Sequence, residues 1–267
     1  MPVTWFAHQA PVLPLKMARP TWFDATALCV GSMMPDLMYS FSAYAHIDTH
    51  ELSTAIAYGV PLTVVVSTII RFVVAPVAAH QIPDLGTFRL HSYAVLSRRR
   101  PRLLVSIVSA SIGVVSHIEL DAFTHTGRWG ARWLGYDDIW VILGRFRHPL
   151  TSVLQYIGHV VGTLVAVLLL WAIGHRRLLD EWYGHGEVEQ ARDRTFGRTQ
   201  FLTFWLFAAA GAVAGLAWGA SDYLDFIQRV AVATFGGVVA GSLILGRRRA
   251  EPPAVDLYRD RGGRVHS

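Results

Sequence analysis

Apolar runs long enough to cross a bilayer alternate with polar segments along this chain. A hydrocarbon core about 30 Å thick needs a helix of ~20 apolar residues. Five runs approach or exceed that length, and they cover residues 52–79, 103–120, 152–173, 200–218 and 226–245. The pattern predicts an all-α fold, a polytopic membrane helix bundle of about five spanning helices.

The first 50 residues do not follow this pattern. Residues 1–20 mix aromatic residues and prolines around Lys16, as in an interfacial or re-entrant arm. A short helix is predicted from Thr21, as its N-cap, to Met34, because Pro35 disfavours a helical residue before it. The apolar part of this helix, about ten residues, is too short to span. We therefore expect a short re-entrant or half-inserted N-terminal helix before the five spans.

Charge refines the membrane interpretation. Hydrophobic residues make up 52% of the chain and charged residues 16%, which is unlike a soluble domain. The arginines cluster at the ends of the apolar runs, so the expected partner is the lipid bilayer and not nucleic acid. Residues 80–102, 175–199 and 247–267 together hold 16 Lys and Arg residues, against four in residues 121–151. The positive-inside rule therefore places those three segments, and the C-terminus, in the cytoplasm. Arg71, inside the first span, is expected to extend its guanidinium toward the membrane surface.

The second apolar run ends in a polar stretch, residues 116–125. In a helix His117, Asp121 and His125 follow one another at i, i+4 spacing and share one face, each about 6 Å further along the axis. Imidazole and carboxylate groups bind Zn²⁺ and related metals. Ionisable groups inside a span are costly, which favours a functional role. A structural alternative stays open, because such residues at helix ends often serve as caps.

With this topology, further ligand-type residues fall on the same membrane face. Those beside His117 and Asp121 are Asp36, His46, His50, His125 and, two turns into the third span, His159. A lone His46 is more often a solvated loop residue than a ligand. Glu119 lies on the other side of the predicted helix. The convergence predicts a divalent metal site, with zinc as the expected ion.

Short motifs recur in an order that resembles a known family. The chain begins MPVT, then has His8, APVLPL at 10–15, GSMMPD at 31–36, Thr49-His50, Ser116-His117 and DAFTH at 121–125. This succession resembles the domain of unknown function 4184 family of bacterial membrane proteins, over residues 1 to about 175. The resemblance implies a multi-pass protein of the bacterial inner (plasma) membrane, and it implies no particular activity.

More distantly, the same succession is similar to YdjM-type membrane-bound metal-dependent hydrolases and to the zinc-dependent phospholipase C fold. That resemblance implies His8, Asp36, His50, His117 and Asp121 as metal ligands. Two features depart from the pattern. Tyr156 stands where a histidine is expected, with His159 three residues on, and the late His-x3-Glu is absent.

These observations lead to a hypothesis with two alternatives. The chain is predicted to be a membrane-embedded metal-dependent hydrolase of phosphoester or lipid-linked substrates. Asp36 or Asp121 would act as the catalytic carboxylate that accepts a proton from metal-bound water. The alternatives are an ion or metal transporter, and a non-catalytic membrane protein with a structural metal site.

The expected organisation has four parts. Residues 1–175 form a metal-site helical membrane domain, and residues 176–199 a charged cytoplasmic loop. Residues 200–246 form a C-terminal transmembrane hairpin, and residues 247–267 a basic disordered tail.

Overall fold

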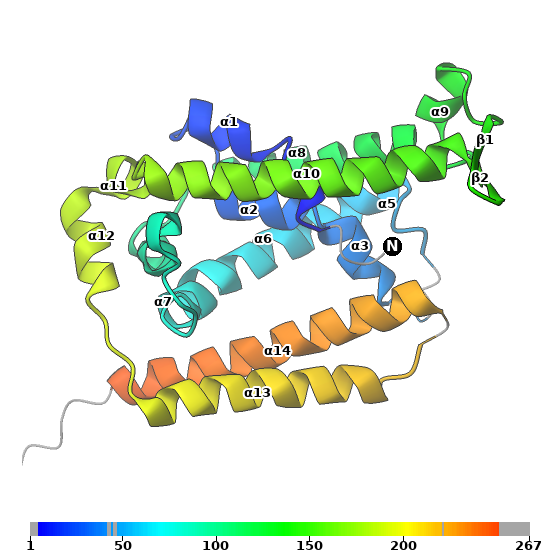
Figure 1. Ribbon diagram of the computed structural model, residues 1–267. Helices are drawn as coiled ribbons and strands as arrows, with labels where there is room; N and C mark the ends of the chain where they lie inside the picture. The colour runs from blue at the N-terminus through cyan, green and yellow to red at the C-terminus, as the bar shows by residue number, and fades with distance from the viewer. Residues whose placement is uncertain (1–4, 42–43, 45–46, 221, 251–267) are drawn as a thin grey trace, which may run out of the picture.

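Long helices dominate the computed structural model, which describes residues 5–41, 44, 47–220 and 222–250 (Figure 1). Five helical segments of the described chain are long and apolar enough to cross a membrane. They are Leu52–Ala78, α8 (Leu103–Thr124), α10 (Leu150–His175), α13 (Arg198–Ala217) and α14 (Tyr223–Ala250). The predicted all-α polytopic bundle with five spans is confirmed. Of the predicted tail, residues 247–267, the first four belong to α14, and residues 251–267 lie outside the described residues.

The first span is irregular because it contains two prolines. Pro61 and Pro76 each stand in the first turn of a new helical piece, where the missing N–H is tolerated. The π-helical turns before them absorb the change in hydrogen bonding. In chain order the pieces are α5 (Leu52–Thr54), η2 (Ala55–Gly59), α6 (Val60–Ile69), η3 (Ile70–Val74) and α7 (Ala75–Ala78).

Before this span the described residues form the short helices η1 (Ala7–Gln9), α1 (Leu13–Ala18), α2 (Ala25–Gly31) and α3 (Met34–Tyr39). The predicted N-cap, Thr21, is wrong. The carboxylate of Asp24 caps α2 instead, by accepting hydrogen bonds from the N–H groups of Thr26 and Ala27 at 3.0 and 3.4 Å. The N-terminal helix is thus shorter than predicted, and its insertion into the membrane stays a prediction.

Helix α2 packs closely against α8 because glycines meet at the crossing. A Cβ atom on Gly113 would lie 2.5 Å from the carbonyl oxygen of Leu28 and 2.9 Å from the Cα atom of Gly31. Small residues allow such backbone approach between membrane helices. The crossing places the end of α2 beside the turn of α8 that carries His117.

Asp24 also forms a buried ion pair, which corrects the expectation for Arg71. The guanidinium of Arg71 is 4% exposed and pairs with Asp24 instead of reaching the membrane surface. It also donates to the hydroxyl groups of Thr26 and Tyr183, each at 3.1 Å. Ser106 donates to the other oxygen of Asp24 at 2.8 Å. A charge inside the bundle is therefore matched by an opposite charge and hydrogen bonds.

The segments between the spans carry more structure than predicted. Residues 80–102, which lie between two predicted spans, contain the 3₁₀ helices η4 (Gly86–Phe88) and η5 (Leu90–Arg98). After α8 come α9 (Trp129–Trp133) and an antiparallel hairpin of β1 (Trp140–Leu143) and β2 (Phe146–Pro149), in which Trp140 pairs with Pro149. The charged segment after α10 forms α11 (Leu178–Tyr183) and α12 (His185–Arg192).

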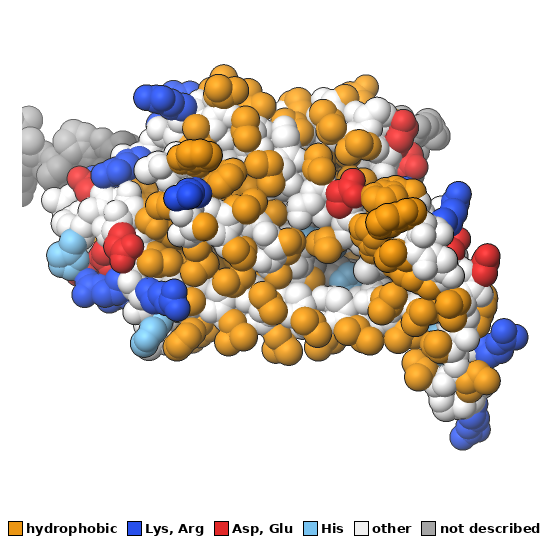
Figure 2. Space-filling model, turned by 90° about the horizontal axis from the view of Figure 1, so that it is seen from above, with side chains coloured by type: hydrophobic (Ala, Val, Ile, Leu, Met, Phe, Trp, Pro, Cys, Tyr) orange, Lys and Arg blue, Asp and Glu red, His pale blue; other side chains and the backbone are white. Residues whose placement is uncertain are grey.

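On the face shown in Figure 2, hydrophobic side chains cover most of the middle, and most of the charged side chains lie toward the two ends. Large apolar residues on the sides of α8, α10 and α13 are exposed, among them Leu104, Leu164 and Leu206. Their exposure is explained by a lipid environment, in which such residues replace the packed core of a soluble protein.

Candidate metal centre

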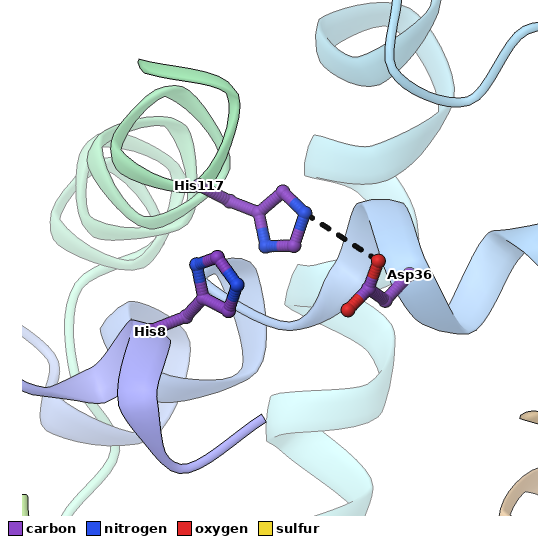
Figure 3. A group of neighbouring side chains, drawn as sticks. All are labelled: His8, Asp36 and His117. Carbon is purple, nitrogen blue, oxygen red and sulfur yellow. Dashed lines mark ion pairs between the residues drawn. The ribbon is translucent and has the colours of Figure 1, made fainter. Parts of the chain in front are cut away.

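Histidine and aspartate side chains meet at the end of the bundle where α8 finishes. His8 comes from η1, Asp36 from α3 and His117 from α8 (Figure 3). His50 precedes the first span, and Asp121 follows His117 by one turn of α8. The structure therefore brings these separate segments together at one end of the bundle.

His117 is held in one orientation. Its Nδ1 lies 2.9 Å from the carbonyl oxygen of Ser32, at the end of α2. A carbonyl only accepts, so Nδ1 carries the proton. When the ring is neutral, Nε2 therefore presents its lone pair to the cluster, and His117 is 0% exposed. This arrangement, a backbone acceptor behind an imidazole, is the usual support of a metal-binding histidine.

Ligand-type atoms surround Nε2 of His117 at even spacing. His50 Nε2 lies 3.4 Å away, Asp121 Oδ2 3.4 Å and Asp36 Oδ1 3.6 Å. His50 Nε2 in turn lies 3.4 Å from Asp36 Oδ1 and 3.5 Å from Asp121 Oδ2. Most of these distances exceed a good hydrogen bond. Two ligands of one zinc ion, each bonded at about 2.0–2.2 Å near the tetrahedral angle, stand about 3.3–3.6 Å apart.

Asp121 faces two groups of histidines with its two oxygens. Oδ2 points to His50 and His117, whereas Oδ1 lies 3.6 Å from His125 Nδ1 and 3.9 Å from His8 Nε2. His125 was expected to continue the helix face. It is instead the extended C-cap residue of α8, and its ring still turns toward Asp121. One carboxylate thus connects both halves of the cluster.

Two further imidazole nitrogens lack partners. The His8 ring stacks on His117 with 4.1 Å between ring centroids, and the His159 ring lies 6.3 Å from His8. Among the described residues, buried His8 Nδ1 and His159 Nε2 have no hydrogen-bond partner. Buried nitrogens without partners are costly. A bound ligand or water molecule would remove that cost, so the two unpartnered nitrogens are consistent with a binding site.

The cluster borders a cavity of about 180 Å³. Gln155 of α10 lies 2.8 Å from His125 Nε2, and Tyr156 beside it is exposed. Sequence reasoning did not assign a role to Gln155, since an amide in an apolar run has no distinguishing spacing. Helix α14 also reaches the cavity, so the C-terminal hairpin encloses the site. The lining residues are His8, Asp36, Tyr39, His50, Asp121, His125, Arg128, Gln155, His159, Leu224 and Gln228.

The protonation of the residues outside the spans suits metal binding. Burial lowers the pKa of His8 to about 4, and the neighbouring His117 acts in the same direction. Burial also lowers the pKa of His125, against the opposing charge of Asp121. Burial disfavours ionisation of Asp36, but His117 and His50 outweigh it and lower the pKa of Asp36. Neutral imidazole and ionised carboxylate are the metal-binding forms.

Three groups of described residues have ligand atoms close enough to hold a metal ion. Two of them, His8 with Asp36 and His117, and His50 with His117 and Asp121, belong to this cluster. The third joins Asp180, His185 and Glu189 on α11 and α12. There arginines already neutralise the acids, as Arg177 lies 2.9 Å from Asp180 and Arg89 3.4 Å from Glu189. His46 lies outside the described residues.

The sequence profile of one protein family matches residues 1–246, which is most of the chain, and its description is Domain of unknown function (DUF4184). The chain belongs to this family. The DUF4184 match covers more of the chain than the motifs at residues 1 to about 175, and it includes the C-terminal hairpin. No curated protein and no solved structure matches the chain. The resemblance to YdjM-type hydrolases and phospholipase C stays a prediction.

Proposed function

We propose that this protein binds one or two divalent transition-metal ions at the end of the bundle where α8 finishes, with zinc as the first candidate. It would use them to hydrolyse a phosphoester or lipid-linked substrate at the outer surface of a bacterial inner membrane. The observation that carries the proposal is the position of Asp121 between two sets of imidazoles. A carboxylate that faces two ligand sets is suited to bridge two metal ions.

The proposed ligand sets follow from the distances. Asp36, His50, His117 and Oδ2 of Asp121 would form the first position. Oδ1 of Asp121 would contribute to the second, with His8 and His125 on either side of it and His159 nearby. These two imidazoles would have to move closer together to bind one ion, because this set is not among the groups of described residues whose ligand atoms already lie close enough. A bound divalent ion lowers the pKa of a coordinated water toward neutrality and supplies a nucleophile at physiological pH.

The carboxylates would have different roles. The side chain of Asp36 is 19% exposed and borders the cavity, whereas that of Asp121 is 9% exposed among histidines. Asp36, which is ionised at neutral pH, can therefore bind the ion through Oδ1 and accept a proton at Oδ2, while Asp121 acts only as a ligand. Arg128 lies on the cavity wall, where its guanidinium can pair with a phosphate group.

Hydrolysis of phosphodiesters and phospholipids by the metal-loaded, detergent-purified chain tests this proposal. Asp36→Asn should lower the rate about 10²- to 10⁴-fold, the usual contribution of a general base. Glu119→Gln is the matched control, because it removes one carboxylate from α8 near His117 without touching the cluster. It should leave the rate unchanged.

Two results would count against hydrolysis. One is a wild type that carries metal and cleaves no phosphoester or lipid. The other is an Asp36→Asn variant as active as the wild type. Metal-dependent ion flux in proteoliposomes, without hydrolysis, would favour the transporter instead.

A further inference from the structure

A second cavity, of about 630 Å³, lies at the opposite end of the bundle from the metal centre. Its walls come from the end of α1, the segment before α2, the start of α8 and the end of α11. Five basic side chains line it, against the two acids Asp24 and Glu181. Those basic residues are Lys16, Arg71, Arg99, Arg100 and Arg102. Because Asp24 is already paired with Arg71, the cavity keeps a clear excess of positive charge.

Two cations of this cavity, Lys16 and Arg99, are held by backbone carbonyl groups. Lys16 is 8% exposed, and its ammonium donates to the carbonyl oxygens of Pro20 and Phe23 at 2.5 and 2.8 Å. An ammonium carries three N–H groups, so one remains for a ligand. Arg99 donates to the carbonyl oxygens of Trp182 and Tyr183 at 3.1 and 3.0 Å. These contacts fix the side chains and leave their charge in place.

The rest of the cluster has no carboxylate in ion-pair contact within the part of the chain that the structure describes. Among the described residues, none lies within 4.0 Å of the basic nitrogens of Lys16, Arg99, Arg100 or Arg102. Neighbouring Arg98, by contrast, lies 3.7 Å from Glu187 and points away from the cavity. Helix α8 starts at the same wall with no side-chain cap on its N-terminal N–H groups, which adds partial positive charge. A phosphate group would satisfy these donors together.

An apolar cavity of about 270 Å³ continues behind the basic one. The two share Lys16, Trp182 and Tyr183 in their linings. The inner part is bounded mainly by hydrocarbon side chains and one thioether, namely Leu13, Val30, Met33, Ile70, Leu96, Leu170 and Ile173. A soluble phosphate compound without a hydrocarbon chain would leave the apolar cavity unfilled. A molecule with an anionic head and a hydrocarbon chain fills both.

We propose that this end of the bundle binds the phosphate headgroup of an anionic phospholipid, with one acyl chain in the apolar cavity. Arg99, Arg100, Arg102 and Lys16 contact the phosphate, and Trp182 and Tyr183 form the boundary between head and chain. The site is separate from the metal centre and does not depend on the proposed hydrolysis. It differs from general attraction of basic loops to anionic membranes, because a cavity takes a defined number of lipids.

Native mass spectrometry of the full, delipidated chain in detergent tests the proposal by titration with phosphatidylglycerol. The test variant is Arg99→Gln/Arg100→Gln/Arg102→Gln. The matched control, Arg176→Gln/Arg198→Gln/Arg247→Gln, removes the same charge from exposed arginines that do not line the cavity. The wild type and the control should retain one tightly bound phosphatidylglycerol. The test variant should bind it about tenfold or more weakly.

Competition identifies the source of the phosphate. Phosphatidylcholine, which has no net charge, should compete poorly, and glycerol 3-phosphate should compete only at far higher concentration because it has no chain. Leu170→Trp, which fills the apolar cavity, should weaken phosphatidylglycerol binding and spare glycerol 3-phosphate.

Three results would overturn the lipid site. The first is equal loss of binding in both triple variants, which would mean diffuse charge attraction. The second is competition by glycerol 3-phosphate as strong as that by phosphatidylglycerol, which would mean a soluble phosphate ligand. The third is equal binding of phosphatidylcholine. Circular dichroism of each variant checks that the bundle has folded.

Discussion

Gly113→Ala is expected to disturb the metal centre although it touches no ligand. The new methyl group would lie 2.5 Å from the carbonyl oxygen of Leu28 and 2.8 Å from the backbone nitrogen of Ser32. Ordinary contact begins near 3.4 Å, so α2 must shift by about 1 Å away from α8. Overpacking of this kind costs about 1–3 kcal/mol.

The shift should reach the site through Ser32. The carbonyl of Ser32 accepts the 2.9 Å hydrogen bond that orients His117, and it moves with α2. Loss of such a supporting contact lowers metal affinity about 10- to 100-fold. Thermal unfolding in detergent and metal affinity by competition with a chelator measure the two effects.

Gly158→Ala is the matched control, since a Cβ at Gly158 of α10 meets no atom within 4 Å. It should leave metal affinity unchanged and increase helix stability slightly. A Gly113→Ala variant with the stability and metal affinity of the wild type would refute the proposed link between the α2–α8 crossing and the site.

Three further outcomes are expected. Asp24→Asn should cost about 3–5 kcal/mol of stability, because it leaves Arg71 buried without a counter-charge; thermal unfolding measures it, and a melting temperature equal to that of the wild type would contradict it. Burial raises the pKa of the Cys29 thiol to about 12, so maleimide should label Cys29 slowly at pH 8 until the protein is unfolded, and fast labelling of folded protein would contradict this. Gln155→Ala removes the contact to His125 and should weaken metal binding about tenfold, an effect that metal titration would detect and that an unchanged affinity would exclude.

The membrane architecture could be predicted from the sequence because a helix needs about 20 consecutive apolar residues to cross a bilayer, and runs of that length can be recognised directly. The N-terminal residues could not, since their partners are distant in sequence. The local pattern predicts Thr21 as the N-cap, which would make Asp24 only the third residue of that helix. Asp24 is the N-cap itself and the partner of Arg71, 47 residues away. A local pattern does not show which remote charge will meet a carboxylate.

In the candidate site, too, the part set by local spacing could be predicted and the part set by distant contacts could not. The i, i+4 spacing of His117 and Asp121 places both side chains on one helix face, and the structure confirms that arrangement. His125 lies beyond the end of the helix, and its position depends on Gln155 in another span. The contribution of α14 to the cavity depends on how the C-terminal hairpin packs, and no spacing in the sequence encodes that contact.

Metal content of the purified chain tests the central claim most directly. The wild type, reconstituted with Zn²⁺ and washed, should carry one or two ions per chain by elemental analysis. His117→Ala and Asp121→Ala should lose them. The double variant Asp180→Asn/His185→Ala, which alters the arginine-paired group on α11 and α12, should keep them. A wild type without stoichiometric metal, or full metal content in His117→Ala, would contradict the account.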